Sequence, residues 1–142
     1  AGAVVRQSFR ETTYEQLRAV FAVNVDGTFH VTQAFTDDLI ARQGRIINVS
    51  SIAGRQGTPM LSAYCASKHA VIGLTRAIAE EFREYGVAVN AICPGSVDTD
   101  MLREGLPGAK PDMTPADIAA CALFLAARAP AAMTGSCVDV FG

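Results

Sequence analysis

The sequence predicts an α/β fold, in which a parallel sheet carries helices on both of its faces. Short apolar runs alternate with longer helical segments, so helix and strand are expected to follow one another three times along the chain. The strand runs are apolar throughout, which is typical of strands buried on both faces, and parallel strands require long crossovers, usually helices. With 142 residues, half of them hydrophobic, the chain is long enough for one domain with its own core.

The first helix is expected over residues 13–42, where Thr12 and Glu15 have the spacing of a capping box. Residues 24–27 include poor helix formers, and they predict a break within this helix. Gly44 is expected to end it, because glycine is the residue most often found just beyond a helix C-terminus.

Residues 45–50 follow as a short buried strand, and the second helix is expected over 62–86. Ser62 has the side chain of an N-cap, and Gly86 suits the position after the last turn. The remaining expected elements are a strand over 87–93, a helix from Thr114-Pro115 to about Ala127 and a strand over 136–140.

The composition argues against several classes of partner. A net charge of −2 without any cluster of Lys and Arg is unlike a surface that binds nucleic acid or an anionic membrane. No apolar run approaches the roughly 20 residues needed to cross a bilayer, and no leader sequence is recognisable. We therefore expect a cytoplasmic protein that acts on a small molecule, with no nucleic-acid or membrane partner.

The sequence contains no pattern that predicts a metal site. His30 and His69 have no metal-like spacing with each other or with a cysteine. The four cysteines form no C-x-x-C pair, which is typical of reduced thiols rather than of ligands or disulfides; they are Cys65, Cys93, Cys121 and Cys137.

Tyr64 and Lys68 form the most informative motif of the chain. Residues at i and i+4 share one face of a helix, roughly 6 Å apart along its axis. An ammonium at that distance favours the phenolate, and so lowers a tyrosine pKa from its usual value of about 10. Ser51, at the end of the preceding strand, could hold a substrate carbonyl against the phenol. Ser50 is the alternative, but the thirteen-residue spacing to Tyr64 favours Ser51. These residues indicate proton chemistry on an alcohol or a carbonyl.

Asn24, Ser51, Tyr64 and Lys68, in this order, resemble the Asn-Ser-Tyr-Lys tetrad of the classical short-chain dehydrogenase/reductase family. The surrounding sequence extends the resemblance over nearly the whole chain, through Val23-Asn24-Val25, Ile47-Asn48-Val49-Ser50-Ser51, Val89-Asn90-Ala91-Ile92-Cys93-Pro94-Gly95, Val97-Asp98-Thr99 and Thr134-Gly135. The resemblance implies a Rossmann-like, doubly wound parallel sheet within a single-domain fold.

The resemblance also implies a role for each member of the tetrad. Tyr64 would be the general acid/base, and Lys68 would lower its pKa and bind the nicotinamide ribose. Ser51 would orient and polarise the substrate carbonyl. Asn24 would lie at the break in its helix and hold a water that connects Lys68 with solvent.

An NAD or NADP cofactor is implied by the same resemblance. Besides Tyr64 and Lys68, the residues expected to contact it are Ala1, Gly2, Pro94, Gly95, Val97 and Thr99. The first two resemble the end of the family's Asn-Asn-Ala-Gly turn. The others follow a strand end, which is where open parallel sheets bind ligands.

The chain departs from the family pattern in lacking the Gly-x-x-x-Gly-x-Gly turn that holds the pyrophosphate. We therefore expect residues 1–142 to be the C-terminal catalytic part of a longer protein. This part would lack the N-terminal strands that hold the cofactor, and it would be inactive alone. The segment between Thr99 and Pro115 is short and rich in Gly and Pro, which predicts a loop and a small lid in place of long helices.

The leading functional hypothesis is an NAD(P)-dependent oxidoreductase that interconverts a secondary alcohol and a ketone, with a 3-oxoacyl thioester or a polyol as the substrate. The alternatives are a non-catalytic relative that only binds nucleotide and a fragment that is inert alone. The helices at 13–42 and 62–86 are apolar around more of their circumference than one sheet face needs. By resemblance such helices pair between subunits, so a homodimer or homotetramer is expected.

Overall fold

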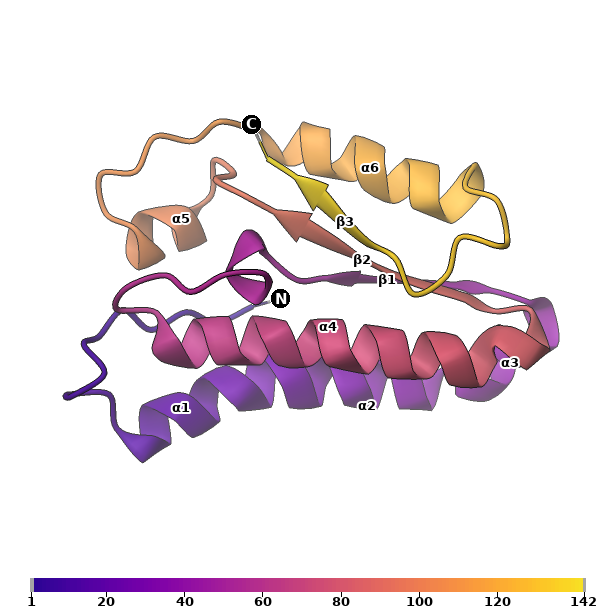
Figure 1. The fold of residues 1–142 in the computed structure, drawn as a ribbon, viewed down its shortest axis with the longest axis horizontal. Helices are drawn as coiled ribbons and strands as arrows, with labels where there is room; N and C mark the ends of the chain where they lie inside the picture. The colour runs from indigo at the N-terminus through magenta and orange to yellow at the C-terminus, as the bar shows by residue number, and fades with distance from the viewer. Residues whose placement is uncertain (1, 142) are drawn as a thin grey trace.

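A computed structural model describes residues 2–141 of the chain as one parallel sheet between two layers of helices. The strands are β1 (Arg45–Val49), β2 (Ala88–Pro94) and β3 (Cys137–Val140), hydrogen-bonded in the order β1-β2-β3. Figure 1 shows helix α6 (Pro115–Ala127) on one face of the sheet and α4 (Ser62–Phe82) on the other. The predicted α/β architecture with a parallel sheet is confirmed.

The helical segment before β1 is divided where the sequence predicted a break. Helix α1 (Tyr14–Phe21) passes through a π-helical turn, η1 (Ala22–Asp26), into α2 (Gly27–Ala34). A second change of direction at Phe35 begins α3 (Thr36–Arg42), which the sequence did not predict. In Figure 1, α1 and α2 lie alongside α4 on the same side of the sheet.

The predicted N-cap of this helical segment is one residue too early, whereas its predicted last residue, Arg42, is confirmed. The capping box uses Thr13 and Gln16, since the Thr13 hydroxyl accepts from the Gln16 amide and the Gln16 side chain accepts from the Thr13 amide. Thr12 instead donates its hydroxyl to the Ser8 carbonyl. At the other end Gln43, with φ of 49°, follows α3 in the left-handed conformation, one residue before Gly44.

Helix α4 begins at Ser62, but Ser62 is not its cap. Leu61 occupies the N-cap position and makes no side-chain capping bond, so that part of the prediction is wrong. The helix ends at Phe82 and tightens into the 3-10 turn η3 (Arg83–Tyr85). Gly86, with φ of 73°, then reverses the chain as predicted, because glycine adopts that conformation without strain.

Each face of the sheet packs against its own helix. On the α4 face, Ile46 and Val89 contact Ala79 and Phe82, whereas on the α6 face Ile92 packs against a buried helix residue, Leu125. Arg45 at the start of β1 adds a polar tie, because its guanidinium donates to the carbonyls of Leu125 and Ala129 at 2.9 and 2.8 Å. These carbonyls lie at the C-terminal end of α6, where backbone acceptors lack helical partners.

The register of β1 and β2 determines where the site forms. Val49 is paired with Ile92, and the Ser50 amide donates to the Ile92 carbonyl at 2.8 Å. Ser51 and Gly95 therefore leave the sheet at the same edge, the carboxyl edge, where parallel sheets bind ligands.

The segment after β2 contains a short helix that the sequence did not predict. Helix α5 (Asp100–Gly105) begins at Thr99, whose hydroxyl accepts from the Leu102 amide at 3.2 Å. The predicted loop is thus wrong for these six residues and holds for the rest of the segment before α6. Helix α6 starts as expected, with Thr114 in a capping box and Pro115 in its first turn. No helix within residues 2–141 has the length and apolar character needed to cross a membrane.

Candidate active site

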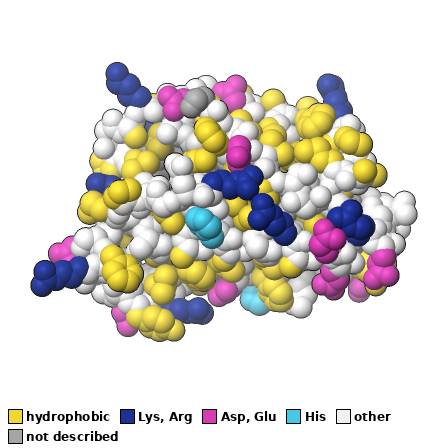
Figure 2. Space-filling model, in the orientation of Figure 1, with side chains coloured by type: hydrophobic (Ala, Val, Ile, Leu, Met, Phe, Trp, Pro, Cys, Tyr) yellow, Lys and Arg dark blue, Asp and Glu magenta, His cyan; other side chains and the backbone are white. Residues whose placement is uncertain are grey.

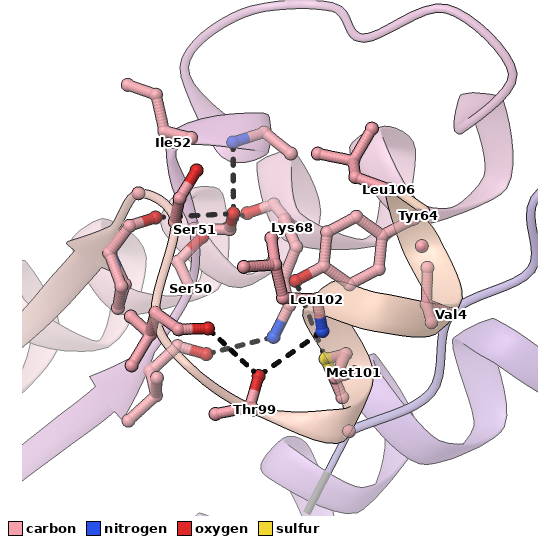
Figure 3. Close-up of a pocket in the computed structure, with 18 of the residues that line it drawn as sticks. Val4, Ser50, Ser51, Ile52, Tyr64, Lys68, Thr99, Met101, Leu102 and Leu106 are labelled. Atoms are coloured by element: carbon pink, nitrogen blue, oxygen red, sulfur yellow. Dashed lines mark hydrogen bonds between the residues drawn. The ribbon is translucent and has the colours of Figure 1, made fainter. Parts of the chain in front are cut away.

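A cavity of about 560 Å³ opens at the carboxyl edge of the sheet. Ser51 reaches it from the end of β1, Tyr64 and Lys68 from α4, and Thr99 and Met101 from the segment after β2. Figure 3 shows the Tyr64 hydroxyl and the Lys68 ammonium directed into the same space. Three of the four predicted catalytic residues line this cavity together.

Tyr64 and Lys68 lie close together, as their spacing on one helix face predicted. The Lys68 ammonium is 5.6 Å from the centre of the Tyr64 ring and donates to the Val49 carbonyl at 3.1 Å. Lys68 is buried, so this carbonyl at the end of β1 fixes the position of its charge. The Tyr64 hydroxyl is 3.9 Å from the Met101 sulfur, a weak acceptor.

Burial is the largest influence on the pKa values of Tyr64 and Lys68. It raises the pKa of Tyr64, while the nearby Ser51 hydroxyl acts in the opposite direction. The expected lowering of the Tyr64 pKa by Lys68 is therefore not the net result in this structure. Burial also lowers the pKa of Lys68, because it destabilises the ammonium.

Ser51 lies where a substrate oxygen can meet both its hydroxyl and the Tyr64 phenol. The Ser51 hydroxyl donates to the Pro94 carbonyl at a long distance of 3.5 Å and accepts from the Ala53 amide at 3.1 Å. Ser50, the alternative candidate, donates its hydroxyl to the Lys68 carbonyl at 2.9 Å. Ser50 is therefore already committed to the backbone of α4, whereas the weak bond of Ser51 is easily exchanged.

Asn24 does not line the cavity but supports the helix that does. Its side-chain amide donates to the Ala3 carbonyl at 2.9 Å and to the Ser67 hydroxyl at 3.0 Å, and its side-chain oxygen accepts from the Ala3 amide at 2.8 Å. Ser67, which is fully buried next to Lys68, donates in turn to the Tyr64 carbonyl at 2.8 Å. Asn24 is thus connected to the catalytic turn of α4, and its expected water-holding role stays a prediction.

The residues expected to contact the cofactor line the same cavity, except Ala1, which lies outside the described residues. The others are Gly2, Pro94, Gly95, Val97 and Thr99. The Gly95 amide donates to the Val140 carbonyl at 3.0 Å, which ties this turn to β3. The Thr99 hydroxyl caps α5 and donates to the Val97 carbonyl at 3.3 Å. A mostly apolar cavity with a buried ammonium and a few hydroxyls is compatible with a nicotinamide ring and its ribose.

Several side chains of the cavity were not identified from the sequence. Val4, Met101 and Leu106 lie around the Tyr64 ring (Figure 3). Leu61 packs in the same cluster, and three of these four residues come from segments without a regular pattern. Ser67 does not line the cavity but supports α4 behind it, and it could have been found because it lies within the Tyr64–Lys68 motif on the buried side of the helix.

Gly54 gives a direct test of how tightly the site is packed. A methyl group there would lie 2.6 Å from the Ser50 hydroxyl and 2.8 Å from the Lys68 carbonyl. We expect Gly54→Ala to destabilise the fold by about 1–3 kcal/mol, because backbone must move to accommodate it. Gly57→Ala is the matched control, since no described heavy atom lies within 4 Å of its added methyl group. Denaturant unfolding of both variants makes the comparison, and equal stabilities would contradict the tight packing at Gly54.

No group of three or more His, Cys, Asp or Glu side chains among residues 2–141 is arranged to hold a metal ion. The four cysteines are free thiols, and burial raises the pKa of Cys93 and of Cys121. Neither position therefore has the lowered pKa that makes a cysteine a nucleophile.

The chain is similar to many known oxidoreductases. The family model described as short chain dehydrogenase matches residues 1–108. The inactive 2-(S)-hydroxypropyl-CoM dehydrogenase 2 of Xanthobacter autotrophicus is 38% identical over all of this chain and 69% of its own length. Galactitol 2-dehydrogenase of Cereibacter sphaeroides is 42% identical over 93% of this chain and 58% of its own length.

A solved structure gives the same result for the fold. The gluconate 5-dehydrogenase of Burkholderia cenocepacia J2315, in complex with NADP and tartrate, matches all of this chain with a TM-score of 0.93 and 28% identity. The match covers 61% of that protein. The chain thus spans between 58% and 69% of the length of these three proteins.

Proposed function

Because the chain belongs to the short-chain dehydrogenase family, we propose that the protein containing it is an NAD- or NADP-dependent oxidoreductase that interconverts a secondary alcohol and a ketone. The observation that carries the proposal is the convergence of Ser51, Tyr64 and Lys68 on one cavity at the carboxyl edge of the sheet. The family resemblance suggests either a 3-oxoacyl thioester or a polyol as the substrate.

Tyr64 is the proposed general acid/base. When a ketone is reduced, its phenol donates a proton to the carbonyl oxygen, and when an alcohol is oxidised, the phenolate accepts one. Burial raises the pKa of Tyr64, which favours the protonated phenol over the phenolate. The adjacent Lys68 ammonium stabilises the phenolate each time it forms.

Ser51 is proposed to hold the substrate oxygen next to that phenol. Its hydroxyl donates only a long bond, to the Pro94 carbonyl, so it can turn and donate to a substrate carbonyl oxygen instead. Asn24 is a positioning residue, which acts through Ser67 on the turn of α4 that carries both Tyr64 and Lys68.

The cofactor would lie along the other side of the cavity. A nicotinamide cofactor supplies or accepts the hydride when it is bound. Lys68 would hold its ribose hydroxyls, and Gly95, Val97 and Thr99 would face the carboxamide side, with Gly2 at the edge of the cavity. The NADP complex of the gluconate 5-dehydrogenase supports a cofactor of this class without deciding between NAD and NADP.

A non-catalytic relative is the second candidate, and one observation favours it. A relative that is 38% identical to this chain is named an inactive dehydrogenase. Against it, Asn24, Ser51, Tyr64 and Lys68 are all present, and the last three share a cavity.

The test uses the full-length protein that contains these residues. It is incubated with NADH or NADPH and a panel of ketones, and the nicotinamide absorbance is followed. We expect the absorbance to fall with at least one ketone. Binding of the cofactor without any turnover would favour the non-catalytic relative, and the absence of both binding and turnover would contradict the proposed oxidoreductase.

Self-association is part of the proposal. Large apolar side chains are exposed on the α1–α2 segment, namely Tyr14, Val23, Phe29 and Val31. Figure 2 shows apolar side chains along the lower edge of the molecule, over α1 and α2. This surface supports a homodimer or homotetramer. Four free thiols are compatible with the proposed cytoplasmic location.

A further inference from the structure

The wall of the cavity around Tyr64 is apolar. We call it the Leu61 wall; its members are Val4, Ala53, Leu61, Met101, Leu102 and Leu106. Leu61 and Ala53 are buried and pack with Val4, Leu106 and the Tyr64 ring into one cluster. These residues come from the N-terminal segment, the connection between β1 and α4, and the lid helix α5. The wall thus forms the apolar side of the cavity next to the Tyr64 ring.

The polar side chains of the cavity have few free hydrogen-bonding groups. Ser50 donates to the Lys68 carbonyl, Lys68 donates to the Val49 carbonyl, and Thr99 is engaged with both Val97 and the Leu102 amide. Thr58 and Ser96 are the further hydroxyl side chains among the described lining residues. A substrate with many hydroxyl groups would leave most of them without partners, and buried unpaired polar groups are unfavourable.

Negative charge on the substrate would also lack a partner. Among the described residues that line the cavity, Lys68 is the single charged side chain, and it faces Tyr64. The two nearby arginines are already paired. Arg55 binds Asp139 at 2.9 Å, and Arg103 binds two carboxylates at 2.7 and 2.9 Å. A carboxylate next to the Leu61 wall would therefore be desolvated without compensation.

We propose that the part of the substrate next to the reacting carbon is uncharged and apolar, as in a simple alicyclic alcohol or its ketone. The inference rests on the proposed function and narrows it, because it makes a polyol or a sugar acid a poor substrate. It differs from what the names of the galactitol and gluconate dehydrogenases state for those relatives.

The test compares three alcohols in the full-length protein with NAD or NADP. Cyclohexanol represents the apolar class, galactitol the polyols and gluconate the sugar acids. We expect kcat/KM for cyclohexanol to exceed the values for both others by about a hundredfold or more, the discrimination that an apolar pocket shows against an added hydroxyl. Tyr64→Phe, measured in parallel, shows whether any turnover depends on the proposed acid/base.

The outcomes separate the two proposals. Preference for galactitol or gluconate, with turnover that needs Tyr64, would overturn the apolar substrate and leave the proposed function intact. Turnover of none of the three alcohols or their ketones would overturn both. Preference for cyclohexanol with dependence on Tyr64 supports both.

A substitution in the Leu61 wall tests the same inference by a change in selectivity rather than by the rate with any one alcohol. Leu106→Gln places an amide beside Tyr64, and we expect it to raise the ratio of galactitol to cyclohexanol kcat/KM by about tenfold. Glu104→Gln is the matched control, because Glu104 is exposed on α5 and does not line the cavity. A purely structural defect would lower kcat/KM for galactitol and for cyclohexanol together. An unchanged ratio of these two values in Leu106→Gln would therefore contradict the role of the Leu61 wall.

Discussion

Replacing Tyr64 with Phe is expected to lower kcat of the full-length protein by about a thousandfold while leaving cofactor affinity nearly unchanged. A positioned general acid/base contributes about 10²–10⁴ to the rate, and the hydroxyl is the only group lost in this substitution. Apolar contacts of the ring survive, because its neighbours Val4, Leu106 and Leu61 pack against carbon atoms. Stopped-flow or steady-state nicotinamide absorbance measures the rate, and fluorescence titration measures cofactor affinity.

Tyr14→Phe is the control for this experiment. Tyr14 begins α1, is 69% exposed and lies outside the cavity, so its hydroxyl has no part in the proposed chemistry. We expect its kcat to equal that of the unmodified protein. Turnover in Tyr64→Phe at the level of the control would remove Tyr64 from the proposed role.

The candidate site residues could be located from the sequence because each depends on a regular element. Ser51 follows an apolar strand, and Tyr64 and Lys68 are one helical turn apart, so local periodicity places the last two on one helix face. The approach of Ser51 to them depends on the packing of α4 against the sheet. The break near Asn24 could also be predicted, since poor helix formers cluster there. In the structure it is a π-helical turn, η1, and it allows the Asn24 side chain to reach Ala3 and Ser67.

The short helix α5 within the predicted lid segment could not be predicted from local sequence. Helix α5 has six residues, too few for a periodic pattern, and contains Gly105. That glycine is tolerated because α5 packs closely on Val4, where an added methyl group would lie 3.1 Å from a Val4 methyl carbon. Such a contact, between residues about a hundred positions apart, depends on the tertiary fold.

The cap residues and the pKa of Tyr64 were mispredicted for different reasons. Thr12 and Thr13 have equivalent side chains, so the sequence does not decide which of them begins the helix. The spacing of Tyr64 and Lys68 gives their separation but not their burial, and burial is the largest influence on both pKa values. Charge proximity alone therefore predicted the opposite direction for Tyr64.

Lys68→Met tests the electrostatic role of the ammonium directly. The two side chains are similar in length, so packing is largely kept while the charge beside Tyr64 is removed. Without the ammonium the phenolate is less stable, and we expect kcat for alcohol oxidation to fall by about a hundredfold. The alkaline rise of the pH–rate profile should move to higher pH, because oxidation needs the deprotonated phenol. Lys110→Met, an exposed lysine outside the cavity, should leave both the rate and the profile unchanged.

Lys68→Met should also change how the free energy of unfolding depends on pH. Burial lowers the pKa of Lys68 below its ordinary value of 10.5, so below the folded-state pKa the native protein holds a desolvated ammonium at a cost. As the pH rises through the folded-state pKa towards 10.5, the folded protein releases this proton first and that cost disappears. The free energy of unfolding of the unmodified protein should therefore increase with pH relative to Lys68→Met in this alkaline window. Denaturant unfolding at several pH values measures the difference. If the difference in unfolding free energy stays constant or declines with pH, the Lys68 ammonium is not desolvated in the folded protein. If the pH–rate profile of Lys68→Met does not move, the ammonium does not act on Tyr64.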